Sequence, residues 1–183
     1  IPVGQAVRVD LTSNDVIHSF WVPQLQYKRD AFPGKFNSIW LQADKPGIYR
    51  GLCAEFCGQQ HAQMHFNVVV LPQDRYQEWV AHEQQPAQEP TDELAKAGEQ
   101  VFLSQQCIFC HTIRGTSAAG QVGPDLTHFA ERKTIAAGAL ENNTGNLAGW
   151  ILDPQHIKPY SLMPATQLSG PELQALLTYL NQL

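Results

Sequence analysis

Sulfur and imidazole side chains are concentrated in two short stretches of the sequence. In the first stretch, Cys53, Cys57, His61 and Met64 follow one another at intervals of three or four residues. The second stretch has the pattern Cys-x-x-Cys-His at residues 107–111. Soft sulfur ligands combined with imidazole suit copper and haem iron, whereas magnesium and calcium prefer oxygen ligands. The residue types therefore predict two redox-active metal sites in one chain.

The first stretch lacks one strong ligand, and His18 is the best candidate for it. Its apolar neighbours in residues 16–22 place it at the end of a buried strand. With His18, the site could be a structural zinc tetrahedron, or two thiolates could bridge two copper ions. Met64 favours copper, because a thioether is a poor zinc ligand and a typical weak ligand of copper. Four cysteines also allow disulfides, but histidine and methionine at ligand spacing argue against them.

The Cys-x-x-Cys-His pattern is the signature of covalent haem c attachment. Cys107 and Cys110 would form two thioethers with the haem, and His111 would be the proximal ligand of the iron. Met163 is the only methionine in this part of the chain, so it is the obvious distal ligand. A place in the apolar core is the alternative for Met163. Bacteria attach haem c outside the cytoplasm, which indicates an oxidising compartment.

Residues 1–83 have the pattern of short strands followed by one helix. The strand-like segments alternate apolar and polar side chains or are rich in β-branched and aromatic residues: 7–11, 36–41 and 65–71. Turn residues separate these segments at 13–15, 32–34 and 44–47. Many short strands with turns between them suggest a β-sandwich or a Greek-key barrel. Residues 72–83 then predict a helix with Tyr76, Trp79 and Val80 on one face.

Residues 84–91 have no apolar periodicity and contain two prolines, which predicts a semi-extended linker. Beyond the linker the pattern is helical. Thr91 can cap a helix that ends near Ser104, with Leu94, Gly98, Val101 and Phe102 facing inward. Two further helices are expected at residues 146–152 and 170–183. We therefore predict an all-β domain with a C-terminal helix at 1–83, a linker at 84–91 and an all-α domain at 92–183.

Composition excludes several functions. The net charge of −5 argues against nucleic-acid binding, which requires a concentrated basic surface. The chain has no apolar stretch of the roughly 20 residues that a membrane helix needs. It begins at Ile1 without an initiator methionine, so we expect a fragment of a longer protein. Paired catalytic carboxylates, a nucleophile elbow and a phosphate-binding loop are all missing, which favours electron transfer over chemistry on a substrate.

Three segments of the first domain resemble the copper A domain of cytochrome c oxidase subunit II: residues 15–23, 28–34 and 53–64. The resemblance implies a cupredoxin-like Greek-key barrel that holds a binuclear copper centre. The implied copper ligands are His18, Cys53, Cys57, His61, Met64 and the backbone carbonyl of Glu55. The resemblance also implies that the Glu55 side chain faces a magnesium or manganese site shared with subunit I.

Three segments of the second domain resemble class I cytochromes c: residues 123–126, 150–154 and 163–164. In that family the carbonyl equivalent to Pro124 orients the proximal histidine. The residue equivalent to Trp150 packs on the haem or meets a propionate, although plain core packing is an equal alternative here. The resemblance implies His111 and Met163 as axial ligands.

The order of the two domains resembles subunit II of a caa3-type cytochrome c oxidase. This implies that the chain passes electrons from an external donor, such as a soluble cytochrome c or another periplasmic carrier, through haem c to copper A. Subunit I would then receive them for oxygen reduction. The parent protein would be anchored in the bacterial cell membrane, with these domains on the periplasmic or outer face. A nitrous oxide reductase fragment and a free-standing carrier or redox sensor are the alternatives. A quinol oxidase subunit is disfavoured, because that branch lacks the copper ligands.

Overall fold

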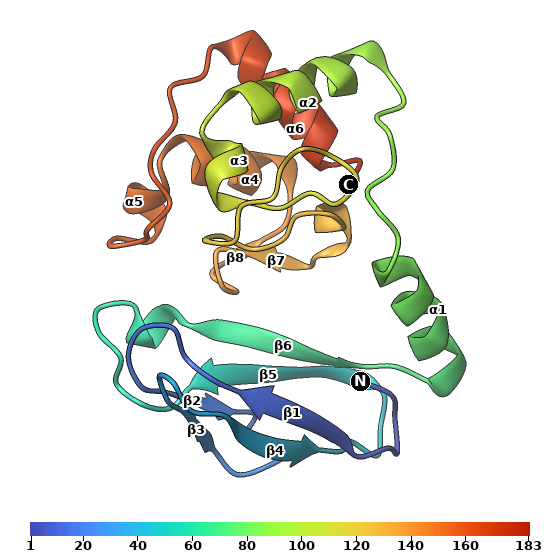
Figure 1. Ribbon diagram of the computed structural model, residues 1–183, viewed down its shortest axis with the longest axis vertical. Coiled ribbons are helices and arrows are strands. Elements are labelled where there is room, and N and C mark those ends of the chain that lie inside the picture. Colours follow the sequence, from blue (N-terminus) through green and yellow to red (C-terminus); the bar gives the residue numbers. More distant parts are fainter. The chain divides into compact units, whose positions relative to one another are not determined.

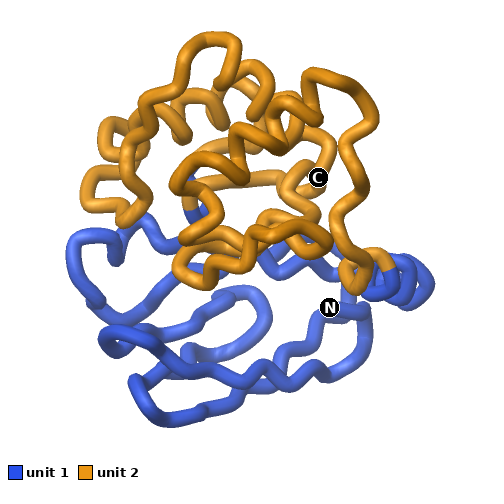
Figure 2. The backbone as a smooth tube through the Cα atoms, turned by 45° about the horizontal axis from the view of Figure 1, so that its top comes forward, with its two compact units in different colours: residues 1–81, 137–139 blue, residues 82–136, 140–183 orange.

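A computed structural model describes residues 1–183 and divides them into two compact units. Unit 1 comprises residues 1–81 and 137–139, and unit 2 comprises residues 82–136 and 140–183 (Figure 2). Each unit has its own cluster of buried apolar side chains. None of the helices combines the length and the apolar character that a membrane span requires.

Unit 1 contains six short strands and most of one helix, which follows the strands in the sequence (Figure 1). The strands are β1 (Val7–Leu11), β2 (His18–Trp21), β3 (Arg29–Ala31), β4 (Asn37–Leu41), β5 (Gly47–Cys53) and β6 (His65–Val70). One sheet pairs β1 with β4, and the other has the order β3-β2-β5-β6. All of these pairs are antiparallel. The predicted strands at 7–11, 36–41 and 65–71 are confirmed to within one residue at each end.

The core of unit 1 follows from the alternation of side chains along its strands. In β6, Val68 and Val70 are buried while Val69 between them is exposed. In β4, Ile39 and Leu41 are buried while Trp40 is exposed. The buried residues of the two sheets thus face one interior, as expected for two packed antiparallel sheets. The strand ladders form two sheets and do not close into a barrel.

The helix α1 (Gln73–Glu83) confirms the helix expected at 72–83. None of its residues is buried, and the exposed fraction of Trp79 is 43%. The rings of Tyr76 and Trp79 lie 5.9 Å apart between centroids, so the two aromatic residues pack mainly on each other. The predicted common face is therefore present, but it does not cover a core.

Unit 2 is mainly helical. Its α-helices are α2 (Glu93–Ser104), α3 (Cys107–Cys110), α4 (Thr144–Leu152), α5 (Pro154–Ile157) and α6 (Gly170–Leu180), with a 3-10 turn η2 (Phe129–Glu131). A two-residue hairpin of β7 (Thr134–Ile135) and β8 (Leu140–Glu141) is added to them. The all-α expectation for this domain is thus corrected by one small hairpin. Strands of two residues have too little periodicity to be recognised in a sequence.

Capping residues define the ends of the long helices of unit 2. The side chain of Asp92, and not that of Thr91 as predicted, accepts a hydrogen bond from the backbone N–H of Ala95 at the start of α2. The hydroxyl of Thr91 instead donates to the side chain of Gln182. At the start of α6, Ser169 and Glu172 form a reciprocal capping box. Asp92 is the cap because its carboxylate is a strong acceptor for the N-terminal amides of the helix.

The helices α2 and α6 pack closely through small residues. Ala95, Gly98 and Phe102 are the buried residues of α2, whereas Leu94 is 41% exposed, which corrects the predicted inward face at that position. A Cβ atom on Gly98 would overlap the backbone carbonyl oxygen of Ala175 and lie 2.8 Å from the Cβ of Tyr179. Gly98 is therefore the point of closest approach between the two helices.

Replacing Gly98 with alanine is expected to destabilise unit 2. Helix propensity alone would favour alanine by about 1 kcal/mol. Overpacking costs about 1–3 kcal/mol, and here the obstacle is backbone, which cannot rotate away as a side chain can. A net loss is therefore expected as a lower thermal midpoint for the loss of helical circular dichroism. Gly170→Ala is the matched control, because no atom lies within 4 Å of its added Cβ. Equal midpoints for the two variants would contradict the close-packing argument.

Residues 84–91 make specific contacts within unit 2. The backbone N–H of Ala87 donates to the carbonyl of Arg114 at 2.8 Å, and the imidazole of His128 contacts the carbonyl of Gln85 at 3.2 Å. Just before this segment, the imidazole Nε2 of His82 lies 2.9 Å from the carboxylate of Glu131. The segment forms neither helix nor strand, and these contacts fasten it to the unit that follows it.

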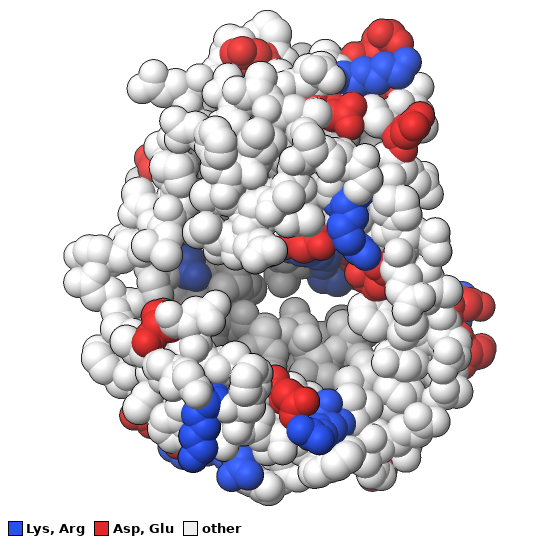
Figure 3. Space-filling model, viewed as in Figure 1, with Lys and Arg blue, Asp and Glu red and all other residues white.

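Charged side chains of both signs are interspersed on the face of the molecule shown in Figure 3. The ion pairs of unit 1 include Arg8 with Asp10 at 2.8 Å, and those of unit 2 include Lys96 with Glu93 at 2.7 Å. Exposed pairs of this kind contribute about 0–1 kcal/mol to stability. The fold therefore depends mainly on its two apolar cores.

Candidate copper and haem sites

The first site lies where β2 and β5 meet. His18 is the first residue of β2 and Cys53 is the last residue of β5. The two strands are neighbours, with Phe20 paired to Cys53, so the sheet brings the imidazole and the thiol to the same edge. The ligand atoms of His18, Cys53 and Cys57 all lie within 4.8 Å of one another.

The loop after β5 supplies the other side chains of this site. It is tied down at its start, because the N–H of Cys53 donates to the carbonyl of Met64 at 3.1 Å and the N–H of Ala54 donates to that of Ser19 at 2.9 Å. A short 3-10 turn, η1 (His61–Gln63), then directs His61 back toward the loop. The candidate ligands from Cys53 to Met64, which are close in the sequence, therefore also lie close together in the structure.

The sulfur atoms of Cys53 and Cys57 are 3.8 Å apart, and each has its own histidine. The Nδ1 atom of His18 is 3.8 Å from the sulfur of Cys53, and the Nδ1 atom of His61 is 3.7 Å from the sulfur of Cys57. Neither cysteine forms a disulfide. Two unbridged thiols, each flanked by an imidazole nitrogen, have the donor atoms and the symmetry that a binuclear metal centre requires.

Two weaker donors complete the set. The thioether sulfur of Met64 lies 3.3 Å from the sulfur of Cys57. The backbone carbonyl oxygen of Glu55 lies 3.2 Å from the sulfur of Cys53. All six residues that the sequence singled out for this site are therefore brought together. The Glu55 side chain is exposed, and Phe56 beside it is 78% exposed, which leaves this edge of unit 1 open to a partner.

The ionisation of the two thiols is coupled. Burial would raise the pKa of Cys53, but hydrogen bonds with Ser19, Glu55 and the neighbouring imidazoles lower it to about 6. Burial and the neighbouring Cys53 thiolate raise the pKa of Cys57 to about 11. In the metal-free protein one thiolate is thus stabilised at the expense of the second, as expected for two like charges at one site.

Asp15 was not assigned a role from the sequence, yet it touches one of the candidate ligands. Its carboxylate lies 2.7 Å from the Nε2 atom of His18 and accepts a second hydrogen bond from Ser13 at 2.9 Å. These two hydrogen bonds lower the pKa of Asp15 to about 2, so the group is ionised at neutral pH. An ionised Asp15 holds the proton on Nε2 and leaves the lone pair of Nδ1 directed toward the thiols. The spacing Asp-x-x-His was the only signal of this contact in the sequence.

The second site is built around the short helix α3. Cys107 and Cys110 are its first and last residues, and His111 follows directly as its C-terminal cap. Both cysteines are unbridged, and burial raises the pKa of Cys107. The imidazole Nδ1 of His111 lies 2.8 Å from the carbonyl oxygen of Pro124. Because that carbonyl accepts a hydrogen bond from Nδ1–H, the Nε2 atom carries the lone pair that can bind a metal.

The backbone beside His111 is shaped to the imidazole ring. A Cβ atom on Gly123 would lie 2.6 Å from Cε1 and 2.8 Å from Nδ1 of His111, so only glycine leaves room for the ring. The N–H of Gly123 also donates to the carbonyl of Cys110 at 2.7 Å, which fixes this turn to α3. The residues present therefore fit a haem with two thioether links and a histidine ligand.

Met163 and Trp150 are both partly buried against the core of unit 2, as are Cys107 and Ile108. Met163 lies in the segment after α5, between α5 and α6. The structure thus places the proposed distal ligand and Trp150 on the same apolar cluster as the haem motif. Lys158, which the sequence did not single out, is only 9% exposed in this segment, and burial lowers its pKa.

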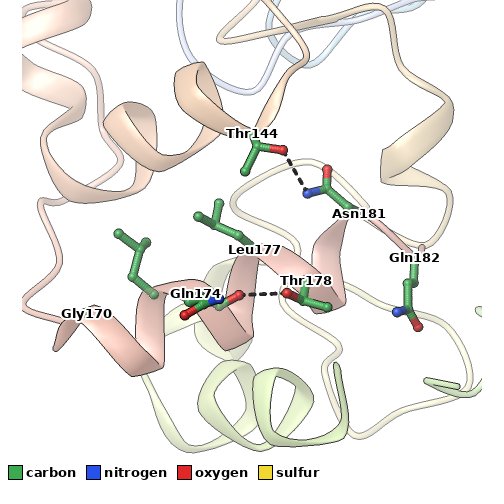
Figure 4. Close-up of a pocket in the computed structure, with 8 residues that line it drawn as sticks. Thr144, Gly170, Gln174, Leu177, Thr178, Asn181 and Gln182 are labelled. Atoms are coloured by element: carbon green, nitrogen blue, oxygen red, sulfur yellow. Dashed lines mark hydrogen bonds between the residues drawn. The ribbon is translucent and has the colours of Figure 1, made fainter. Parts of the chain in front are cut away.

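A separate hollow lies on the surface of unit 2 beside α6 (Figure 4). The hydroxyl of Thr144 accepts a hydrogen bond from the side chain of Asn181 at 3.4 Å, and that of Thr178 donates to the carbonyl of Gln174 at 2.9 Å. Both hydrogen bonds therefore join residues that line the hollow to one another, and no residue of the haem motif lines it. It contributes nothing to either candidate site.

Comparison with known proteins matches each part of the chain to a different family. Residues 1–71 match the family model of the periplasmic domain of cytochrome c oxidase subunit II, and residues 95–183 match the cytochrome c family. Cytochrome c oxidase subunit 2 of Alkalihalophilus pseudofirmus is 47% identical over 184 residues, which cover 100% of this chain and 53% of the relative. The subunit 2 of Bacillus sp. strain PS3 is 37% identical over 196 residues, covering 100% of this chain and 54% of the relative.

The chain spans about half the length of these curated relatives. Among solved structures, the periplasmic domain of subunit II of the Bradyrhizobium japonicum cytochrome oxidase is 39% identical. The match covers 45% of the present chain and 59% of the Bradyrhizobium chain, with a TM-score of 0.44. The two matched segments place the copper-type motif in the first family and the Cys-x-x-Cys-His motif in the second. The chain is therefore similar to the periplasmic domain of cytochrome c oxidase subunit II over residues 1–71 and to cytochrome c over residues 95–183.

Proposed function

We propose that this chain is the electron-accepting part of subunit II of a caa3-type haem-copper oxidase. It would pass electrons from an external donor through haem c to copper A and on to subunit I, where oxygen is reduced. One observation carries the proposal: two unbridged thiols 3.8 Å apart, each beside its own imidazole, occur in one chain with a Cys-x-x-Cys-His motif. By itself the chain would be an electron carrier without the oxygen-reducing site.

Cys53 and Cys57 would bridge two copper ions, with His18 and His61 as terminal ligands. Met64 and the carbonyl of Glu55 would be weak ligands. When bound, the two coppers and the haem would supply centres that exchange one electron at a time. The role of the chain is to hold the ligands still, because ligands that hardly move keep the cost of electron transfer small. The sheet edge, the hydrogen bonds of the Cys53 loop and Asp15 behind His18 all support such rigidity.

A structural zinc site is the competing assignment for the same thiols. It would use Cys53, Cys57 and two histidines in a tetrahedron. The Met64 sulfur, 3.3 Å from the Cys57 sulfur, is superfluous in that arrangement but is a typical weak ligand for copper. The position of Met64 therefore favours copper.

Cys107 and Cys110 would hold the haem covalently, and His111 and Met163 would be its axial ligands. The carbonyl of Pro124 orients the imidazole by accepting a hydrogen bond from its Nδ1–H group, and Gly123 makes space for the ring. Trp150 would pack against the haem or meet a propionate. Pro124 and Gly123 would fix the proximal ligand before any electron arrives.

The remaining assignments concern the parent protein. Subunit I and an external donor, such as a soluble cytochrome c, are the proposed partners, and nucleic acid is not. The exposed Glu55 side chain is suited to a magnesium or manganese ion shared with subunit I. We place the parent protein in the bacterial cell membrane with both domains on the periplasmic or outer face. The proposed domains are a cupredoxin-like domain with Greek-key strand order and a C-terminal helix at 1–83, a linker at 84–91 and a cytochrome c domain at 92–183.

Electron delivery can be tested with the oxidised chain loaded with haem and copper. Mixing with a limiting amount of reduced soluble cytochrome c, without oxygen, should reduce haem c first. The haem should then be reoxidised as the copper electron paramagnetic resonance signal disappears. The second phase should not depend on protein concentration, because both centres lie in one chain. A haem that stays reduced beside oxidised copper, or a stoichiometric zinc content, would refute the proposed order of transfer.

The partnership with subunit I requires the parent protein. Affinity purification of that protein from detergent-solubilised membranes should recover haem a and cyanide-sensitive oxygen uptake driven by reduced cytochrome c. Recovery of the protein alone, with both of its own centres intact, would instead identify a free-standing carrier.

A further inference from the structure

The segment that presents Met163 has little structure of its own. Residues 158–163 follow the short helix α5 and form neither helix nor strand. Tyr160 has a φ of +68° and is 66% exposed, and Leu162 is 92% exposed. A non-glycine residue in this region of backbone space is uncommon and needs support from its surroundings. The exposed side chains of Tyr160 and Leu162 do not provide that support.

The side-chain amide of Gln155 provides it. Its Nε2 group donates to the carbonyl oxygens of Ser161 at 2.6 Å and Met163 at 3.3 Å. Its Oε1 atom accepts from the backbone N–H of Tyr160 at 3.0 Å. One side chain thus satisfies three backbone groups across the loop. These partners also fix the orientation of the amide. A flipped amide would place its NH2 group against the N–H of Tyr160 and its oxygen against the carbonyl oxygens of Ser161 and Met163.

Gln155 lies on the short helix α5, which is itself held in place. It is the second residue of α5, whose N-terminus is capped by Asp153 accepting from the N–H of His156 at 3.1 Å. Pro154, the first residue of α5, is fully buried. On the far side of Met163, the hydroxyl of Thr166 donates to the carbonyl of Ile151 in α4 at 2.8 Å. The backbone around Met163 is therefore held on both sides by side chains from α5 and from the loop itself.

We propose that Gln155 is a positioning residue for Met163: its amide sets the shape of the loop that presents the thioether to the haem iron. This inference rests on the proposed function, in which Met163 is the distal ligand. A loop preorganised in this way binds the iron without first losing conformational freedom, so exogenous ligands compete poorly. Without the amide, the loop would have to be ordered each time the thioether binds. Competing ligands would then bind the iron more tightly.

The test uses the full chain with covalently bound haem in the ferric state. Imidazole is titrated against it, and the weak near-infrared band of thioether-to-iron ligation is followed. Gln155→Ala should keep the haem but bind imidazole about tenfold more tightly than the wild-type chain. Tenfold corresponds to about 1.4 kcal/mol, the size expected for one or two net hydrogen bonds.

Gln155→Glu separates positioning from simple loss of volume. Glutamate has the same length and can still accept from the N–H of Tyr160, but its carboxylate cannot donate to the two carbonyl oxygens. It should therefore also bind imidazole more tightly, and it covers the case in which the alanine variant fails to fold. Gln174→Ala is the matched control, since Gln174 is an exposed glutamine on α6 of the same unit. The control should retain the wild-type imidazole affinity.

Wild-type imidazole affinity in both Gln155 variants, with the near-infrared band intact, would overturn the positioning role. Equal gains in Gln155→Ala and Gln174→Ala would also overturn it, because the effect would then not be specific to the loop. A wild-type chain without the near-infrared band is a different failure. It would refute ligation by Met163, and with it the haem assignment in the proposed function.

Discussion

Replacing Cys53 with serine is expected to abolish the binuclear copper signal while leaving the haem spectrum unchanged. An unpaired electron shared by two equivalent copper nuclei of spin three-halves gives seven hyperfine lines, whereas a single copper gives four. Serine cannot bridge two coppers as a thiolate does, because its hydroxyl is a harder ligand and stays protonated at neutral pH. The variant should bind one copper or none, as measured by metal analysis and electron paramagnetic resonance.

Met64→Leu is a useful comparison for the copper site. It removes a weak donor and leaves both thiols and both imidazoles in place, so the seven-line pattern should survive with altered splittings. The haem absorbance gives an internal control in each variant, because Cys107 and Cys110 belong to the other unit. A four-line pattern in the wild-type chain, or binuclear copper retained in Cys53→Ser, would show that the two cysteines do not bridge.

Local patterns in the sequence were sufficient to predict three of the six strands of unit 1, β1, β4 and β6, and the close grouping of candidate ligands after β5. The alternation in residues 7–11 and the compact spacing from Cys53 to Met64 are properties of neighbouring residues, and the structure preserves them. His18 was predicted as the missing ligand from its apolar flanks. The register of β2 and β5 brings it beside Cys53 from a distant part of the chain.

Side-chain contacts between separate segments could not be predicted in this way. Gln155 was ordinary in the sequence, because its importance depends on the conformation of the loop that it contacts. The cap of α2 was placed one residue too early, since Thr91 and Asp92 are both good capping residues, and both contact Gln182 from the far end of the sequence. The contacts of residues 84–91 with Arg114 and His128 likewise have no periodic signature. Local rules identify elements and motifs, whereas positioning depends on tertiary structure.

Replacing Met163 with alanine is expected to have the largest effect on the haem. The haem should remain attached, because its thioether links to Cys107 and Cys110 do not depend on the distal side. Loss of the thioether should remove the near-infrared band of sulfur-to-iron ligation. It should also lower the reduction potential, because the thioether stabilises ferrous iron more than ferric iron. Axial ligands tune haem potentials over about 0.8 V, so a fall on the order of 0.1 V or more is expected.

Leu162→Ala is the matched control for this experiment. Leu162 precedes Met163 in the same loop and is 92% exposed, so its side chain can be shortened without opening a cavity. The control should keep both the band and the potential, as measured by absorbance during a redox titration. If Met163→Ala retained the band, another residue would be the distal ligand, and Met163 would be one more apolar side chain packed against the core of unit 2. If both variants lost the band, the loop as a whole would be too weakly held to present Met163. A change confined to Met163→Ala therefore assigns the ligand, because the two variants differ only in whether the iron loses a sulfur donor.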